Sequence, residues 1–387
     1  MFDKSPELFP VKNQYAYFIH CGISPLFSRA LAKELEISTE HQKTGAFLFL
    51  KKYDEVLDGL RDAGGALLKT DPENISFVKN TSEGISQIAG GYPFEPGDEV
   101  VIYTNEYPAN FYPWILQEQR GVRTVNLQNV SGDRGKSAPD LPVTWSLSDL
   151  EELVTKKTKV VAISHVQFTS GYGVDLPALA GFCRERNIDL VVDAAQSLGS
   201  LPLYPVELGI AAIAASGWKW LLGPIGTGLL YSAPEFRAKL KPVMAGADLM
   251  KQGTDYLDHT WDPYQSGKMF EYSTSPISLA AALEVCIREL PLRYGIENII
   301  KELIRLQNLF LGKLDKDRYM PLVPPPVGRS GILSFTHVSG DSQMVVQRSF
   351  DMGIALSARG GLIRFAPHVY NDEDEIERAI AVLNNIG

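Results

Sequence analysis

The sequence predicts an α/β protein built around a mostly parallel sheet. Short apolar runs typical of buried strands occur at residues 100–103, 160–164, 190–192 and 228–231. Between these runs, apolar residues recur at the spacing of amphipathic helices. Because strands that alternate with helices form parallel sheets covered by those helices, this order favours an α/β fold.

A helix and a second region complete the expected order of elements. Segment 176–183 places its apolar residues on one helix face, which suits a helix packed against a sheet. The polar, glycine-containing stretch 245–268 interrupts the alternation, and a long helical pattern follows at 277–290. Strand-like runs at 331–336 and 363–366 then indicate an α+β region.

The length of 387 residues suits one large domain with an appendage, or two domains. We therefore expect a large domain over residues 15–268 and a smaller domain over residues 269–387, joined by residues 1–14. The apolar share of 45% is ordinary for a globular protein with a sizeable core.

Charge and composition exclude several classes of protein. The net charge of −9 argues against nucleic acid and anionic membranes as partners, because both require clustered basic residues. There is no signal-peptide pattern and no apolar run of membrane-spanning length. The three cysteines lack C-x-x-C spacing, and the six histidines lack the spacing of metal ligands. We expect a soluble cytoplasmic enzyme that holds no metal.

Lys219 is the most informative residue of the chain. It lies between Trp218 and Trp220 in a segment otherwise made of small and apolar residues. Burial disfavours the charged ammonium, and a lysine with a lowered pKa is a nucleophilic amine that can form a Schiff base with an aldehyde. The alternative is a structural lysine whose stem covers the tryptophans while its ammonium reaches water.

Asp193 is the second residue that points to a ligand site. It ends the apolar run 190–192, and ligands of open α/β sheets bind at the carboxyl ends of such strands. A helix-capping role is the alternative for this acid. A buried lysine together with such an acid indicates pyridoxal phosphate, which needs a lysine for attachment and a carboxylate beside its pyridine nitrogen.

These residues lie in a recognisable pattern, D-[AG]-A-Q followed by S-G-x-K. In this respect the chain resembles the class V aminotransferase family, which includes the cysteine desulfurases, over nearly its whole length. The resemblance implies a fold type I pyridoxal-phosphate enzyme with a large and a small domain. It assigns the pyridinium partner to Asp193, a donor to the ring hydroxyl to Gln196, a phosphate ligand to Ser216 and the Schiff-base lysine to Lys219. Trp218 replaces the usual histidine, so the phosphate contact of that position is not expected.

Further motifs extend the cofactor site. Thr81 and Ser82 match a T-[TS]-E-[AG] motif whose hydroxyls and amides hold the phosphate in the family, although a plain helix cap explains the same residues. Tyr107 matches an aromatic residue that stacks on the cofactor ring, and an ordinary tyrosine at a strand end is its alternative. Phe168 stands where desulfurases have an asparagine, with Gln167 as a weak substitute.

Two motifs concern the second subunit and the substrate. Thr274 lies in a segment similar to F-E-x-G-T, whose threonine reaches the partner's phosphate in the family, so the resemblance implies a homodimer with shared active sites. Arg364 matches the arginine that clamps the substrate carboxylate, a role that suits a bidentate guanidinium. An exposed ion pair is its alternative, and Arg359 is a second, weaker candidate.

The cysteines bear on which reaction is catalysed. Desulfurases carry a nucleophilic cysteine just before the clamp arginine, and residues 360–363 contain none. Cys183 and Cys286 fall on helix core faces, whereas Cys21 lies in an N-terminal segment that the family brings near the substrate.

Persulfide-forming desulfuration is therefore disfavoured. The motifs favour the branch of C–S lyases and isopenicillin-epimerase-like proteins. The leading expectation is a C–S lyase-type elimination on an amino acid. Transamination and epimerisation stay open, and a non-catalytic homologue that binds the cofactor is the alternative from another class.

Overall fold

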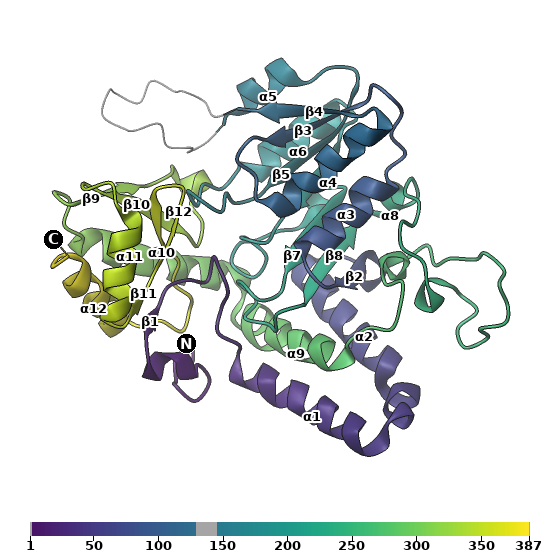
Figure 1. Cartoon of the computed structure of the whole chain (residues 1–387), viewed down its shortest axis with the longest axis horizontal. Helices are drawn as coiled ribbons and strands as arrows, with labels where there is room; N and C mark the ends of the chain where they lie inside the picture. The colour runs from purple at the N-terminus through teal and green to yellow at the C-terminus, as the bar shows by residue number, and fades with distance from the viewer. Residues whose placement is uncertain (1, 129–144, 387) are drawn as a thin grey trace.

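The computed structural model describes residues 2–128 and 145–386, and its main feature is a seven-stranded mixed sheet (Figure 1). The strands follow the order β2-β8-β7-β6-β5-β3-β4, and only β8 runs antiparallel to its neighbours. Their bounds are β2 Ile75–Val78, β3 Glu99–Tyr103, β4 Arg123–Leu127, β5 Thr158–Ser164, β6 Asp189–Asp193, β7 Ala212–Ser216 and β8 Gly228–Ser232. The predicted α/β fold with a mostly parallel sheet is confirmed.

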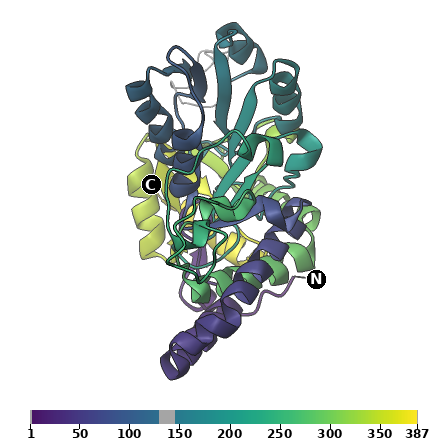
Figure 2. The ribbon, with the colours of Figure 1, turned by 90° about the vertical axis from the view of Figure 1, so that its right-hand side faces the viewer.

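Helices surround this sheet and a smaller second one. The helices are α1 Ser28–Thr44, α2 Ala46–Leu68, α3 Thr81–Gly91, α4 Tyr112–Ile115, α5 Leu147–Leu153, α6 Leu176–Glu185, α7 Pro205–Leu208, α8 Pro234–Arg237, α9 Ile277–Ile287, α10 Ile296–Lys313, α11 Ser342–Asp351 and α12 Glu373–Leu383. In Figure 2, α1 and its junction with α2 project from the body of the molecule. Short helical turns, among them Pro108–Asn110 and Gly267–Phe270, connect the longer elements.

The central strands read as continuous apolar runs because both of their faces are covered. Every residue of β3, β7 and β8 is buried, and so are four of the five residues of β6. In such a sheet the only polar side chains near the strands lie at their ends, where the chain leaves the core. This arrangement collects polar groups at the carboxyl edge of β5, β6 and β7.

The second sheet is antiparallel and lies at the opposite end of the molecule (Figure 1). It has the order β12-β13-β10-β9, with bounds Ser357–Arg359, Leu362–Phe365, Leu333–His337 and Tyr319–Leu322. A separate short pair joins β1 Ala16–Tyr17 to β11 Ile354–Ala355 in parallel. The N-terminal segment therefore runs from the second sheet toward the large sheet and passes between them.

Two hydrophobic cores correspond to the two sheets. The first includes α9 through Ala280 and Leu283, and the second includes Ala16 and Phe18 together with the second sheet. The division into residues 15–268 and 269–387 with 1–14 stays a prediction. For function, the important point is that the carboxyl ends of β5, β6 and β7 face the second sheet across a cavity.

Candidate active site

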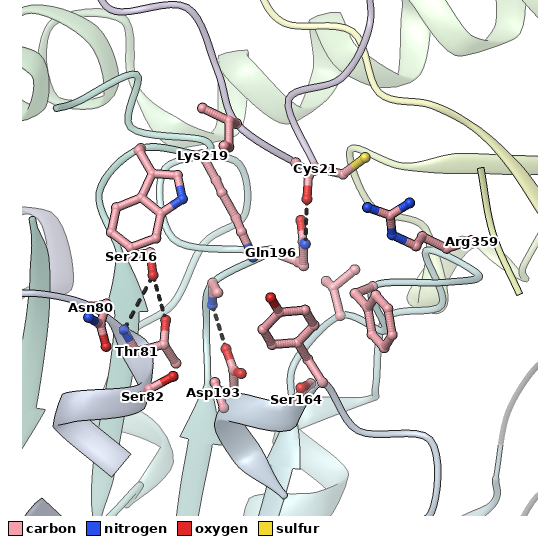
Figure 3. A pocket seen from close by; sticks show the side chains of 18 of the residues that line it. Cys21, Asn80, Thr81, Ser82, Ser164, Asp193, Gln196, Ser216, Lys219 and Arg359 are labelled. Atoms are coloured by element: carbon pink, nitrogen blue, oxygen red, sulfur yellow. Dashed lines mark hydrogen bonds between the residues drawn. The ribbon is translucent and has the colours of Figure 1, made fainter. Parts of the chain in front are cut away.

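A cavity of about 530 Å³ lies where the carboxyl ends of β5, β6 and β7 face the second sheet. Ser164, Asp193 and Ser216, the last residues of these three strands, all line it (Figure 3). All of the predicted site residues except Thr274 line this cavity: Cys21, Thr81, Ser82, Tyr107, Asp193, Gln196, Ser216, Lys219, Arg359 and Arg364. Residues up to 343 positions apart in sequence (364 − 21) therefore meet in one place.

The N-terminus of α3 forms one end of the cavity. Asn80 caps the helix by accepting a hydrogen bond from the amide of Glu83 at 2.8 Å. The Ser216 hydroxyl lies 2.9 Å from the Thr81 hydroxyl and 3.3 Å from its amide nitrogen. The positive end of the helix dipole and a cluster of hydroxyls, including Ser82, form a site for an anion such as phosphate.

Asp193 lies deep in the middle of the cavity wall. It is 4% exposed, and the amide of Ala195 donates a hydrogen bond to its Oδ1 at 2.8 Å. Burial raises the pKa of Asp193, whereas the positive charge of Lys219 opposes that rise. A buried carboxylate of this kind is stabilised by a cation, and the protonated nitrogen of a pyridine ring is a suitable one.

Gln196 connects this wall to the N-terminal segment. Its Nε2 donates to the carbonyl oxygen of Cys21 at 2.8 Å, and its Oε1 accepts a hydrogen bond from the indole of Trp220 at 3.1 Å. The side chain is buried. One N–H of the amide is left for a ligand of the cavity.

Lys219 extends from the turn after β7 into the same cavity (Figure 3). Burial lowers its pKa, whereas the charge of Asp193 acts in the opposite direction. Its Nζ lies 5.4 Å from the centre of the Tyr107 ring, and the Ser24 hydroxyl holds its backbone carbonyl at 2.6 Å. The side chain therefore points into a shared cavity as a nucleophilic amine, which favours the functional interpretation over a structural lysine that reaches bulk water.

Aromatic rings also line the cavity. Tyr107 is 47% exposed and packs edge-to-face on Phe168, with ring centres 5.3 Å apart. Phe168 and Trp218, where the sequence departs from the family motif, also line the cavity. Gln167 does not, because its amide donates instead to Glu106 at 3.3 Å.

Glu106 is a residue that the sequence analysis missed. Its buried carboxyl accepts hydrogen bonds from the amide of Ser164 at 2.8 Å and from the hydroxyl of Ser164. Burial raises its pKa to about 7, against the effect of the hydrogen bonds from Ser164. These hydrogen bonds fix the segment directly before Tyr107 to the end of β5. An acid three residues after the end of β3 was the only sequence signal, and nothing marked it as buried.

The raised pKa of Glu106 predicts a pH dependence of stability. The carboxyl of Glu106 has a pKa of 4.5 in the unfolded chain and about 7 in the folded protein. Its contribution to the free energy of unfolding is therefore fully present below pH 4.5 and is lost as the pH rises through 7. The loss amounts to about 3 kcal/mol. Glu106→Gln mimics the protonated acid, so its stability relative to the parent protein should rise between pH 5 and pH 8.

Urea unfolding at several pH values measures this difference. The same exchange at the exposed Glu118 is the matched control and should show no such trend. An equal pH trend for the parent protein and Glu106→Gln would contradict the assignment.

Arg364 lies buried on β13 at the other wall. It donates through Nη1 to the carbonyl oxygen of Phe168 at 2.6 Å and through Nε to the hydroxyl of Ser357 at 3.1 Å. In the part of the chain that the structure describes, no carboxylate forms an ion pair with it. This disagrees with the alternative of an exposed ion pair and leaves guanidinium N–H groups for an anion in the cavity. Arg359 is exposed and bonded to the carbonyl of Ala358.

Cys21 lies close to this arginine. Its thiol is buried and lies 3.7 Å from the hydroxyl of Ser357, which is also bonded to Arg364. Cys183 and Cys286 are buried in the core and line no part of the cavity. Of the three cysteines, only Cys21 can touch a ligand there.

Thr274 lies outside the cavity on an exposed segment that follows Glu271. Glu271 forms a buried ion pair with Arg61, and the segment continues to α9. The chain thus places Thr274 away from its own cavity.

Over residues 2–128 and 145–386, no cluster of three or more potential metal-ligating side chains is present. No helix in these ranges has the length and apolar character needed to cross a bilayer.

Comparisons with known proteins agree with this geometry. The family model described as aminotransferase class-V matches residues 17–378. A probable cysteine desulfurase of Methanothermobacter thermautotrophicus is 26% identical, over 95% of this chain and 94% of its own length.

Solved structures share the fold. The cystine C-S lyase C-DES, in complex with its reaction product cysteine persulfide, matches with a TM-score of 0.87 and 24% identity, over 98% of this chain and 100% of that one. An apo cysteine desulfurase from Thermococcus onnurineus NA1 matches with a TM-score of 0.85 and 23% identity, over 99% and 98% of the two chains.

Proposed function

The chain belongs to the aminotransferase class-V family, and we propose that it is a pyridoxal-phosphate lyase that cleaves the C–S bond of a sulfur amino acid. The family supports the cofactor, and the cavity supports the substrate and the reaction. The preference for elimination over other reactions depends on the hairpin that precedes Arg364.

The residues of the cavity fit pyridoxal phosphate group by group. The start of α3 with Ser216 suits its phosphate, Asp193 suits its ring nitrogen, and Lys219 suits its aldehyde. When bound, this cofactor supplies an aldehyde for the substrate amine and a ring that accepts the electron pair released at Cα. The protein contributes the orientation and the proton transfers.

Three side chains carry the chemistry of the protein. Lys219 would hold the cofactor through its amine, and the same amine, when free, would be the base that takes the proton from Cα. Arg364 binds the substrate carboxylate through its remaining N–H groups. Tyr107, which lines the same cavity, would offer its aromatic ring as a stacking surface for the cofactor.

The hairpin between β12 and β13 is the observation that favours elimination over desulfuration. Arg359 pairs with Leu362, so only Gly360 and Gly361 form the turn. Both glycines have positive φ, 56° and 79°, as a tight two-residue hairpin requires. A desulfurase-type cysteine loop has no room at this position, and a thiol there would need a backbone conformation that residues with side chains rarely adopt.

Desulfuration remains a second candidate because Cys21 lines the cavity. In that reaction the thiol of Cys21 would take the sulfur of cysteine as a persulfide and alanine would be released. The hairpin argument does not apply to Cys21, which enters from the N-terminal segment.

We propose in addition that two copies of the chain form a dimer with shared active sites. Thr274 is exposed and outside its own cavity, so it can reach a cofactor phosphate only in a second copy. The stretch 245–268 carries exposed Tyr256, Leu257 and Trp261, which a partner would cover.

Product analysis with a panel of amino acids tests the function. We expect cysteine or cystine to yield pyruvate and ammonia, together with a sulfur product, without any added keto acid. Alanine with a persulfide on Cys21 would instead establish desulfuration. A keto acid formed only with an acceptor would mean transamination, and loss of chirality alone would mean epimerisation; either result would refute the lyase.

A further inference from the structure

The indole of Trp220 joins the cofactor cavity to the second sheet. It directly follows Lys219 and is 1% exposed. Its ring stacks on that of His368 with centres 6.0 Å apart, and His368 Nε2 lies 3.2 Å from its carbonyl oxygen. A Cβ at Gly331 would lie 2.3 Å from the indole, so the chain leaves room there for this ring. The indole is therefore held from both sides.

Trp220 determines which way the Gln196 amide points. An indole N–H only donates, so the atom of Gln196 that lies 3.1 Å from it must be the oxygen. The amide nitrogen then faces Cys21, whose carbonyl oxygen only accepts, at 2.8 Å. The two contacts agree on one orientation and leave the second N–H of the amide unused.

We propose that Trp220 is a positioning residue, which holds Gln196 with its nitrogen toward the cavity so that Gln196 donates a hydrogen bond to the oxygen of the cofactor's ring hydroxyl. This inference rests on the proposed cofactor. Without the indole donor, the buried Oε1 of Gln196 has no partner, and only the carbonyl oxygen of Cys21 still holds the amide in this orientation. Whenever the amide turns over, its oxygen faces the oxygen of the cofactor's ring hydroxyl, acceptor against acceptor.

The visible absorption of the bound cofactor reports on this contact. A hydrogen-bond donor to the oxygen of the ring hydroxyl stabilises the deprotonated form of the bound cofactor. Losing this donor therefore raises the midpoint pH of the change in absorption. For Trp220→Phe we expect the midpoint to rise by about one unit and the cofactor to bind about tenfold more weakly.

A matched control is present in the same chain. Trp114 is fully buried and donates through its indole to Oδ1 of Asn110 at the same distance, 3.1 Å, but lines no part of the cavity. Trp114→Phe removes an equivalent hydrogen bond and should leave the absorption midpoint where it is.

A double-mutant cycle separates positioning from general destabilisation. Gln196→Met should raise the midpoint by itself, and adding Trp220→Phe should then raise it no further. An equal shift by Trp220→Phe in both backgrounds would overturn the inference.

If Trp220→Phe does not fold, benzothienylalanine at position 220 keeps the shape of the indole without its N–H. An unchanged midpoint in that protein also overturns the inference. A protein with no visible cofactor band would refute the proposed function instead, so the two failures are distinguishable.

Discussion

Replacing Lys219 by alanine is expected to lower kcat by about 10³-fold or more and to leave no covalent link between protein and cofactor. The physical reason is the cavity environment, where burial lowers the pKa of Lys219 and its Nζ lies over the Tyr107 ring. The amine of Lys219 would attach the aldehyde and later take the Cα proton, so both functions disappear with the side chain.

Borohydride reduction followed by peptide mapping checks the attachment. In the parent protein the label should lie on Lys219, and in Lys219→Ala no lysine should carry it. Lys239→Ala is the matched control, because that lysine forms a surface ion pair with Asp189 away from the cavity. A label on another lysine of the parent protein would sink the assignment of Lys219.

Arg364→Ala is expected to lower kcat/KM for amino-acid substrates by roughly 10²–10³-fold. Arg364 is buried at the cavity wall, where a carboxylate would meet its unused N–H groups in a site shielded from water. The bound cofactor should keep its visible absorption, since the residues that suit its phosphate and its ring nitrogen lie on α3 and at the ends of β6 and β7.

Arg359→Ala is the comparison that gives this result meaning. Arg359 is exposed, so water screens its charge, and its loss should change kcat/KM only a few-fold. Substrate saturation curves for both variants separate the two arginines. If Arg359→Ala shows the larger loss, the roles of the two residues are reversed.

Much of the site could be predicted from sequence because its groups lie at strand ends. Asp193 and Ser216 each follow an apolar run, and the parallel order of those runs places their carboxyl ends at one edge. The predicted α/β fold followed from the same pattern. Thr81 could be placed because it begins a helix directly after the capping residue Asn80, and such caps have a local signature.

The remaining features depend on contacts between distant segments. Glu106 looks like any acid after a strand until β5 lies beside it and Ser164 donates to it. From the sequence, Trp220 looks like an ordinary core residue. Only the structure shows that its indole donates to Gln196 and stacks on His368. Neither contact leaves a trace in composition or spacing.

The amino-acid sequence by itself determined the fold class, the family resemblance and the residues that suit the cofactor, since these depend on local periodicity and on short motifs. Only the tertiary structure decided that Arg364 is buried without an acidic partner and that Cys21 lines the same cavity as Lys219. The reason is that the two sheets and the N-terminal segment each supply one wall, and packing alone brings those walls together.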